Sequence, residues 1–219
     1  MATRELLAQL GAAYGEREGA VVQIESVGGV DAARRVQAGE PFDVVVLASD
    51  AIDRLAAAGA LLAGSKVDLV HSPVAVAVRA GAALPDLGSE AALRRAVQSA
   101  PSIGYSTGPS GTALLRLFER WGLADELRPR LVQAPPGVPV GTLVARGEAA
   151  LGFQQLSELI HLDGLALAGV LPPPVAIVTT FSGAVGARAA QPAAARRLLA
   201  FMAGPGSAAA KRGQGMEPA

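Results

Sequence analysis

Cysteine is absent from this 219-residue chain, which excludes disulfides, thiolate nucleophiles and thiolate metal sites. Aromatic residues make up only 4% of it, too few for the stacking platforms that single-stranded nucleic acids require. Acidic and basic side chains number 19 each, without the basic excess typical of proteins that contact phosphate backbones. The two histidines, His71 and His161, lie too far apart in the sequence to form a ligand cluster. We therefore expect no nucleic-acid partner, no metal and no cofactor.

Long hydrophobic runs are also missing, although 51% of the residues are apolar. The longest run, near Val44, stops at Asp50, far short of the roughly 20 residues that a membrane-spanning helix needs. No basic and apolar leader is recognisable, because Met1 leads directly into a helix pattern. Two explanations stay open at this point: a leader has been removed, or the protein is cytoplasmic.

The apolar residues occur instead in short segments that alternate between strand and helix patterns. A helical pattern over Ala2–Arg17 is followed by alternation over Val21–Val27, which indicates a strand. The continuous apolar run Phe42–Ala48 is typical of a buried parallel strand, and a helix is expected at Asp50–Ala58. This alternation predicts an α/β protein in which helices cover mostly parallel sheets.

The same pattern continues through the second half of the chain. We expect strands at Val74–Val78, Ser102–Tyr105, Leu131–Ala134 and Ala150–Gln154. We expect helices at Ser89–Ala100, Ala113–Trp121, Gln155–His161 and Pro192–Met202, the last followed by a short polar tail.

Two segments rich in glycine or proline divide the chain. Gly81–Gly88 follows one expected strand, and Pro172–Pro174 precedes an extended run that ends at Thr180. We interpret them as crossings between two lobes. Lobe I would contain residues 1–78 and 179–219, lobe II residues 79–178, and a ligand would bind in the cleft between them.

Three strand-to-helix junctions could bind an anion. They are Ala48–Asp50, Gly108–Gly111 and Gly137–Pro139. Ligands of open α/β sheets bind at the carboxyl ends of strands, where unpaired N–H groups at helix starts favour an oxyanion. Each junction alone is weak evidence, since a serine at a helix start is usually only a cap. The second junction is not a nucleotide phosphate loop, because no lysine follows it.

Taken together, the junctions resemble those of molybdate-binding periplasmic proteins. The stretch ARRVQAGEPFDVVVLASD resembles a strand of that family that ends in a ligand-binding serine, here Ser49. GPSGTALLRLFERWG is similar to the anion loop of the family's second lobe, and VPVGTLVARGEAALGFQQ resembles the segment that supplies a backbone donor and a tyrosine. The resemblance covers nearly the whole chain and implies a two-lobed type 2 periplasmic-binding-protein fold.

The resemblance also implies a set of ligand-binding residues: Ser49, Gly108, Ser110, Gly111, Val138 and Gln155. Gln155 departs from the pattern, because it occupies the position of the family's ligand tyrosine. In the family a strand that ends in another ligand serine precedes the segment Ala2–Arg17, and we identify no counterpart of it here.

Three functions remain open. The first is a monomeric periplasmic protein that binds a small oxyanion or carboxylate and delivers it to the permease of an ABC transporter. The second is an isomerase of a small unsaturated polycarboxylate, as in the aconitate isomerases that resemble this fold. Its proton-transfer or cationic groups would come from His71, His161, Glu25 or Arg4. The third, an effector domain of a transcription regulator, lacks a helix-turn-helix pattern in the first 40 residues.

Overall fold

The computed structural model describes all residues, 1–219. The chain forms two compact units, unit 1 (Met1–Ser72 and Thr179–Ala219) and unit 2 (Pro73–Val178). The first division point falls within strand β2 (Val67–Arg79), earlier than the boundary after residue 78 that the sequence suggests. The second falls within strand β7 (Val178–Val185). Binding of a ligand between the units stays a prediction.

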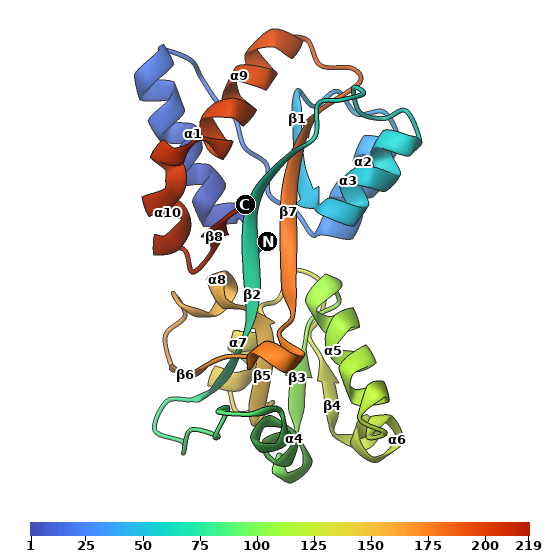
Figure 1. Ribbon diagram of the computed structural model, residues 1–219, viewed down its shortest axis with the longest axis vertical. Coiled ribbons are helices and arrows are strands. Elements are labelled where there is room, and N and C mark those ends of the chain that lie inside the picture. The colour runs from blue at the N-terminus through green and yellow to red at the C-terminus, as the bar shows by residue number, and fades with distance from the viewer. The chain divides into compact units, whose positions relative to one another are not determined.

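Unit 1 is a sheet covered by helices on both faces. Its strand order is β1 (Val44–Ala48), β7 and β2, and the short strand β8 (Glu217–Pro218) pairs with β2. Figure 1 shows one group of helices on one side of these strands: α1 (Arg4–Glu18), α9 (Pro192–Ala203) and α10 (Ala208–Gly213). The other side carries α2 (Gly29–Gln37) and α3 (Ser49–Ala57), and the 3-10 turn η3 (Pro205–Ser207) joins α9 to α10.

The sequence predicts the buried strand of unit 1 well and two other segments incorrectly. Val45, Leu47 and Ala48 are buried, as the continuous apolar run indicates. Val21–Val27 is not a strand in the structure, and Val21 is 89% exposed. An alternating pattern forms a strand only where another strand's N–H and C=O groups pair with it, and here none does. The expected polar tail instead folds into α10 and β8.

Unit 2 is a second sheet, with strand order β2, β5 (Leu151–Gln155), β3 (Ile103–Tyr105) and β4 (Leu131–Gln133). The strand β6 (Leu165–Val170), which the sequence pattern does not predict, also pairs with β2. One side of the sheet carries α5 (Pro109–Arg120) and the other α7 (Val140–Ala145) and α8 (Leu156–Leu159) (Figure 1). The remaining helical segments are α4 (Glu90–Ser99), α6 (Ala124–Leu127), η1 (Arg128–Arg130) and η2 (Pro173–Val175).

Pairing in the sheets is mixed, where the sequence predicts mostly parallel strands. The parallel pairs are β3 with β4 and β3 with β5. The antiparallel pairs involve β2 or β7, the two strands in which the division points lie. The prediction therefore holds for the part of unit 2 in which each strand is followed by a helix.

Two glycines allow α7 to pack very close to the sheet of unit 2. A Cβ at Gly104 would lie 2.9 Å from Val140, and one at Gly152 would lie 2.5 Å from Val144. Val140 and Val144 are both fully buried. This close packing holds the start of α7 at the carboxyl ends of β3 and β5, where the sequence predicts ligand donors.

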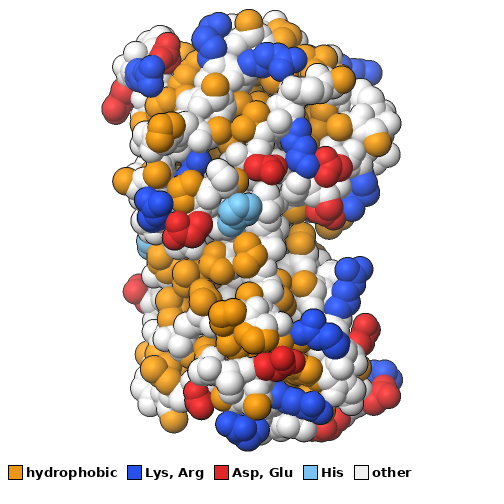
Figure 2. All heavy atoms as spheres, in the orientation of Figure 1, with side chains coloured by type: hydrophobic (Ala, Val, Ile, Leu, Met, Phe, Trp, Pro, Cys, Tyr) orange, Lys and Arg blue, Asp and Glu red, His pale blue; other side chains and the backbone are white.

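No helix of the structure is both long enough and apolar enough to cross a lipid bilayer. On the face drawn in Figure 2, Lys and Arg side chains are interspersed with Asp and Glu side chains.

Candidate functional site

A pair of serines lies where strand β3 passes into helix α5. The Oγ atoms of Ser106 and Ser110 are 3.0 Å apart, so one hydroxyl donates a hydrogen bond to the other. Ser110 is buried and Ser106 is half-buried. Each of the two hydroxyls carries one hydrogen, and this contact uses only one of them, so the other hydrogen remains available for donation. The serine pair can therefore donate a hydrogen bond to an anion.

The first turn of α5 supplies backbone donors beside the serine pair. Gly108 is the N-cap residue, and no side chain caps the helix. The N–H groups of Ser110 and Gly111 have no acceptor within the protein. Unpaired N–H groups at a helix start carry a partial positive charge, which favours bound anions. This junction is an anion-binding arrangement made entirely of uncharged donors.

Gly111 is required by the close approach of α5 to the loop before it. A Cβ at this position would lie 1.8 Å from the carbonyl oxygen of Ser106, which no side chain can tolerate. Gly108 differs, because the nearest atom to its Cβ would be the Ser106 Oγ at 3.7 Å. The two glycines predicted as ligand-binding residues thus have different structural roles.

The start of α7 is arranged differently, because a side chain of the protein already binds its donors. The Gln154 Oε1 accepts hydrogen bonds from the Val140 N–H at 2.7 Å and from the Gly141 N–H at 3.4 Å. Val138, the backbone donor that the resemblance implies, donates to the Pro135 carbonyl at 3.0 Å. The backbone N–H groups of Val138, Val140 and Gly141 therefore all have acceptors within the protein.

The pairing of β3 with β5 brings the segment before α5 and the end of β5 to the same edge of the sheet in unit 2. In the parallel pairing of β3 with β5, Tyr105 lies opposite Phe153. The residues that follow, Ser106 on one side and Gln154 and Gln155 on the other, are therefore neighbours at the carboxyl ends of their strands. Gln155 is buried, with 3% of its surface exposed, and has an interaction of its own.

Unit 1 places Ser49 at a comparable position. Ser49 is the first residue of α3, its hydroxyl has no partner within the protein, and no side chain caps the helix. Ser49 is therefore not acting as an N-cap.

Ala48 pairs with Phe181, which brings Thr180 opposite Ser49 at the end of the ladder. The Thr180 Oγ1 shares a hydrogen bond of 3.0 Å with the His71 Nδ1. Of the four candidate proton-transfer or cationic groups, His71 is thus linked through Thr180 to the end of the strand ladder that precedes Ser49.

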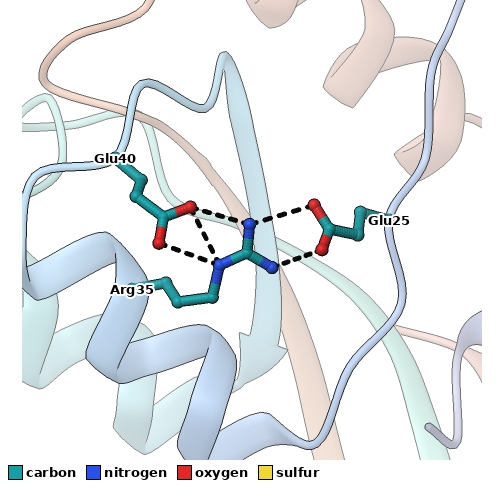
Figure 3. A network of polar contacts seen from close by, with 3 residues as sticks. All are labelled: Glu25, Arg35 and Glu40. Atoms are coloured by element: carbon teal, nitrogen blue, oxygen red, sulfur yellow. Dashed lines mark hydrogen bonds and ion pairs between the residues drawn. The ribbon is translucent and has the colours of Figure 1, made fainter.

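The other three candidates are placed less favourably. Glu25 and Glu40 both bind the guanidinium of Arg35, with Arg35 Nε 2.8 Å from a Glu40 oxygen (Figure 3). The hydrogen bond from Arg35 lowers the pKa of Glu25, which makes it a weak base. Arg4 is exposed, and its Nε lies 3.7 Å from the Glu5 Oε1. His161 is exposed on the turn after α8.

Three polar residues in unit 2 were not singled out from the sequence. Ser106 lies at the edge of a recognised motif, and Gln154 occupies a position where an apolar residue would be expected in a buried strand. Glu158 follows in α8, and burial raises its pKa. The available signal was two consecutive glutamines at the end of an apolar strand.

Two surface recesses lie elsewhere. One, of about 180 Å³, is in unit 1 near Gly39 and Arg188, and another, of about 310 Å³, is in unit 2 between α5 and η2. Neither contains any of the predicted ligand-binding residues.

Comparison with known proteins identifies the family. Residues 1–217 match the sequence pattern of the family described as bacterial extracellular solute-binding protein. The chain belongs to this family. A curated relative, the aconitate isomerase of a Pseudomonas species, is 40% identical to this solute-binding protein over 185 residues, which are 84% of this chain and 70% of the relative.

Solved structures agree on the fold of this solute-binding protein. The periplasmic molybdate-binding protein of Azotobacter vinelandii is similar with a TM-score of 0.82 and 22% identity, over 98% of this chain and 94% of the other. L-phospholactate-bound PEB3 is similar with a TM-score of 0.77 and 12% identity, over 99% and 96% of the two chains. These likenesses confirm the predicted type 2 periplasmic-binding-protein fold.

Proposed function

We propose that this solute-binding protein binds a small unsaturated tricarboxylate and interconverts the cis and trans isomers of aconitate. The observation that carries the proposal is its 40% identity to an aconitate isomerase over 84% of the chain. The solved structures have at most 22% identity to this chain among those compared above, so they support the fold and leave the ligand open. We therefore take the proposed class of ligand from the aconitate isomerase, which is more similar in sequence than the solved structures.

The geometry of unit 2 is consistent with a carboxylate ligand. The serine pair and the free N–H groups of Ser110 and Gly111 are donors that a carboxylate oxygen accepts. Hydrogen bonds to a charged group contribute about 1.5–3 kcal/mol each, so a few such donors support specific binding. Unit 1 has donors of its own, the hydroxyl of Ser49, which has no partner within the protein, and His71, which shares a hydrogen bond with Thr180.

The proposal is tested by turnover. The purified protein is incubated with trans-aconitate, and the vinyl proton signals of both isomers are followed by NMR. We expect cis-aconitate to accumulate from trans-aconitate and trans-aconitate from cis-aconitate, until both mixtures reach the same ratio of isomers. A protein that binds aconitate and leaves both isomers unchanged over many hours would contradict the enzymatic part of the proposal.

A second function is delivery of an oxyanion such as molybdate to the permease of an ABC transporter in the periplasm. One observation favours it: the first turns of α3 and α5 contain no Arg or Lys, and a fully ionised tetrahedral anion is commonly held by such fixed neutral dipoles. Isothermal titration of molybdate, sulfate, citrate and both aconitates separates the two functions. Tight molybdate binding without any response to aconitate would support transport.

A further inference from the structure

A recess in unit 2 lies between helix α5 and the 3-10 turn η2, and the serine pair does not line it. Its volume of about 310 Å³ is near the lower end of the range for pockets that bind small molecules, about 300–1,000 Å³. Six of the residues that line it are apolar, two are the arginines Arg116 and Arg120, and none is acidic. This lining suits a ligand that has an apolar part and a negative charge.

The apolar floor of the recess belongs to the hydrophobic core of unit 2. Leu117 and Val175 are each 4% exposed and belong to one core cluster. Three consecutive prolines, Pro172–Pro174, precede Val175, and their fixed φ angles hold the η2 wall in one conformation. The recess is therefore formed before a ligand arrives, which lowers the entropy cost of binding.

The two arginines have no partner within the protein. Arg116 and Arg120 are both exposed, and neither forms an ion pair or a hydrogen bond with another side chain. Arg128 and Arg130, in the segment that follows, differ, because each pairs with a carboxylate of α6. Side chains four residues apart on a helix are neighbours, and like charges at this spacing repel each other. An anion bound by both guanidinium groups would remove this repulsion.

The arginines and the apolar floor share one stripe of α5. The stripe consists of Ala113, Arg116, Leu117 and Arg120, whose spacing of i, i+3, i+4 and i+7 is that of a single helix face. Figure 2 shows Lys and Arg side chains next to hydrophobic ones on the side of unit 2 where α5 lies. One ligand can therefore contact both kinds of side chain at once.

We propose that this recess is a second ligand site, which binds a small organic anion with a doubly charged head and an apolar body. The guanidinium groups of Arg116 and Arg120 bind the oxygens of the head, since guanidinium matches carboxylate and phosphate geometry. A double charge neutralises both arginines, which a single carboxylate does not. The apolar body lies on Leu117 and Val175 and is removed from water there. The site goes beyond the proposed isomerisation, because none of the residues assigned to that reaction lines the recess.

The test uses phenyl phosphate as the probe and follows the backbone amide signals of the whole chain by NMR. We expect saturable shifts at Leu117 and Val175, which report a dissociation constant for this recess alone. Inorganic phosphate lacks the apolar body and should bind at least about tenfold more weakly, as the burial of a phenyl group implies. Benzoate has the ring but one charge, and it should also bind more weakly.

Arg116→Gln and Arg120→Gln should each raise the dissociation constant of phenyl phosphate about threefold, as expected for exposed ion pairs. Arg95→Gln is the matched control, because Arg95 is an exposed arginine of the same unit without an ion pair, and it should leave binding unchanged. Ala113→Leu fills the recess and keeps both charges, so it should weaken phenyl phosphate binding and not phosphate binding. Thermal unfolding checks that all variants are folded.

Four results would overturn the proposal. Shifts confined to Ser110 and Gly111 would place the anion at the start of α5. Equal affinity for phenyl phosphate and inorganic phosphate would show that the apolar floor contributes nothing, and equal affinity for benzoate would exclude a doubly charged head. An equal loss of affinity in Arg95→Gln and Arg116→Gln would show that only the overall charge of the surface attracts the probe.

Discussion

The starts of helices α5 and α7 follow neighbouring strands of one sheet, yet they differ in what occupies their backbone donors. At α5 the N–H groups of Ser110 and Gly111 have no acceptor, and the serine pair lies beside them. At α7 the Gln154 Oε1 occupies the corresponding donors. Both helix starts have the same sequence character, rich in Gly and Pro. A helix start is therefore a candidate anion site only when no side chain from elsewhere in the chain fills it.

The largest effect should come from Gly111→Ala, which tests how tightly the α5 junction is built. Its Cβ would overlap the Ser106 carbonyl oxygen, so the loop or the helix must move. We expect destabilisation of about 1–3 kcal/mol or more, measured by urea unfolding. Gly108→Ala is the matched control, since its Cβ has room and its φ of −84° suits alanine. Equal stability of the two variants would show that the junction is loose.

Gln154→Ala should have the next largest effect, because it removes the acceptor at α7. The buried N–H groups of Val140 and Gly141 would lose their partner, and an unsatisfied buried donor costs about 1–3 kcal/mol. Gln133→Ala, at an exposed position of β4, should stay within about 0.5 kcal/mol. If Gln154→Ala has no effect on the free energy of unfolding, then the start of α7 is as open as that of α5.

The sequence predicts most elements of the fold but not which helix starts are open. The run Phe42–Ala48 identifies a buried strand because burial on both faces requires continuous apolar residues, and the expected helix follows it, beginning at Ser49, one residue earlier than predicted. Val21–Val27 fails because a strand needs a partner that its own pattern does not encode. The contact between Gln154 and Val140 spans 14 positions, so no local motif reveals it.

Ser49→Ala should have a small effect on stability, in contrast to the two changes above. The Ser49 hydroxyl caps no helix and has no partner within the protein, so the free energy of unfolding should change by about 0.5 kcal/mol or less. Loss of a capping serine would cost about 1 kcal/mol, which unfolding measurements resolve. A loss of that size would mean that Ser49 has a structural role and would weaken its assignment to ligand binding.

The smallest effect is expected at the charged network of Glu25, Arg35 and Glu40, which lies on the surface of unit 1. The pKa of Glu25 is lowered in the folded protein, so its contribution to stability is present above the usual glutamate pKa of about 4.3. That contribution is lost as the pH falls through the lowered value. The melting temperature of Glu25→Gln should lie slightly below wild type at neutral pH and converge with it in acid. A difference independent of pH and salt would contradict this account.

The most direct test of the open α5 site is the affinity of trans-aconitate for the wild type and for Ser110→Ala, measured by titration calorimetry. Ser110→Ala removes one hydroxyl of the serine pair and retains the backbone N–H groups. Losing one hydrogen bond to a charged ligand should weaken binding by about 1.5–3 kcal/mol, which is a tenfold or greater increase in the dissociation constant. An unchanged dissociation constant, in a variant as stable as the wild type, would show that the anion binds elsewhere.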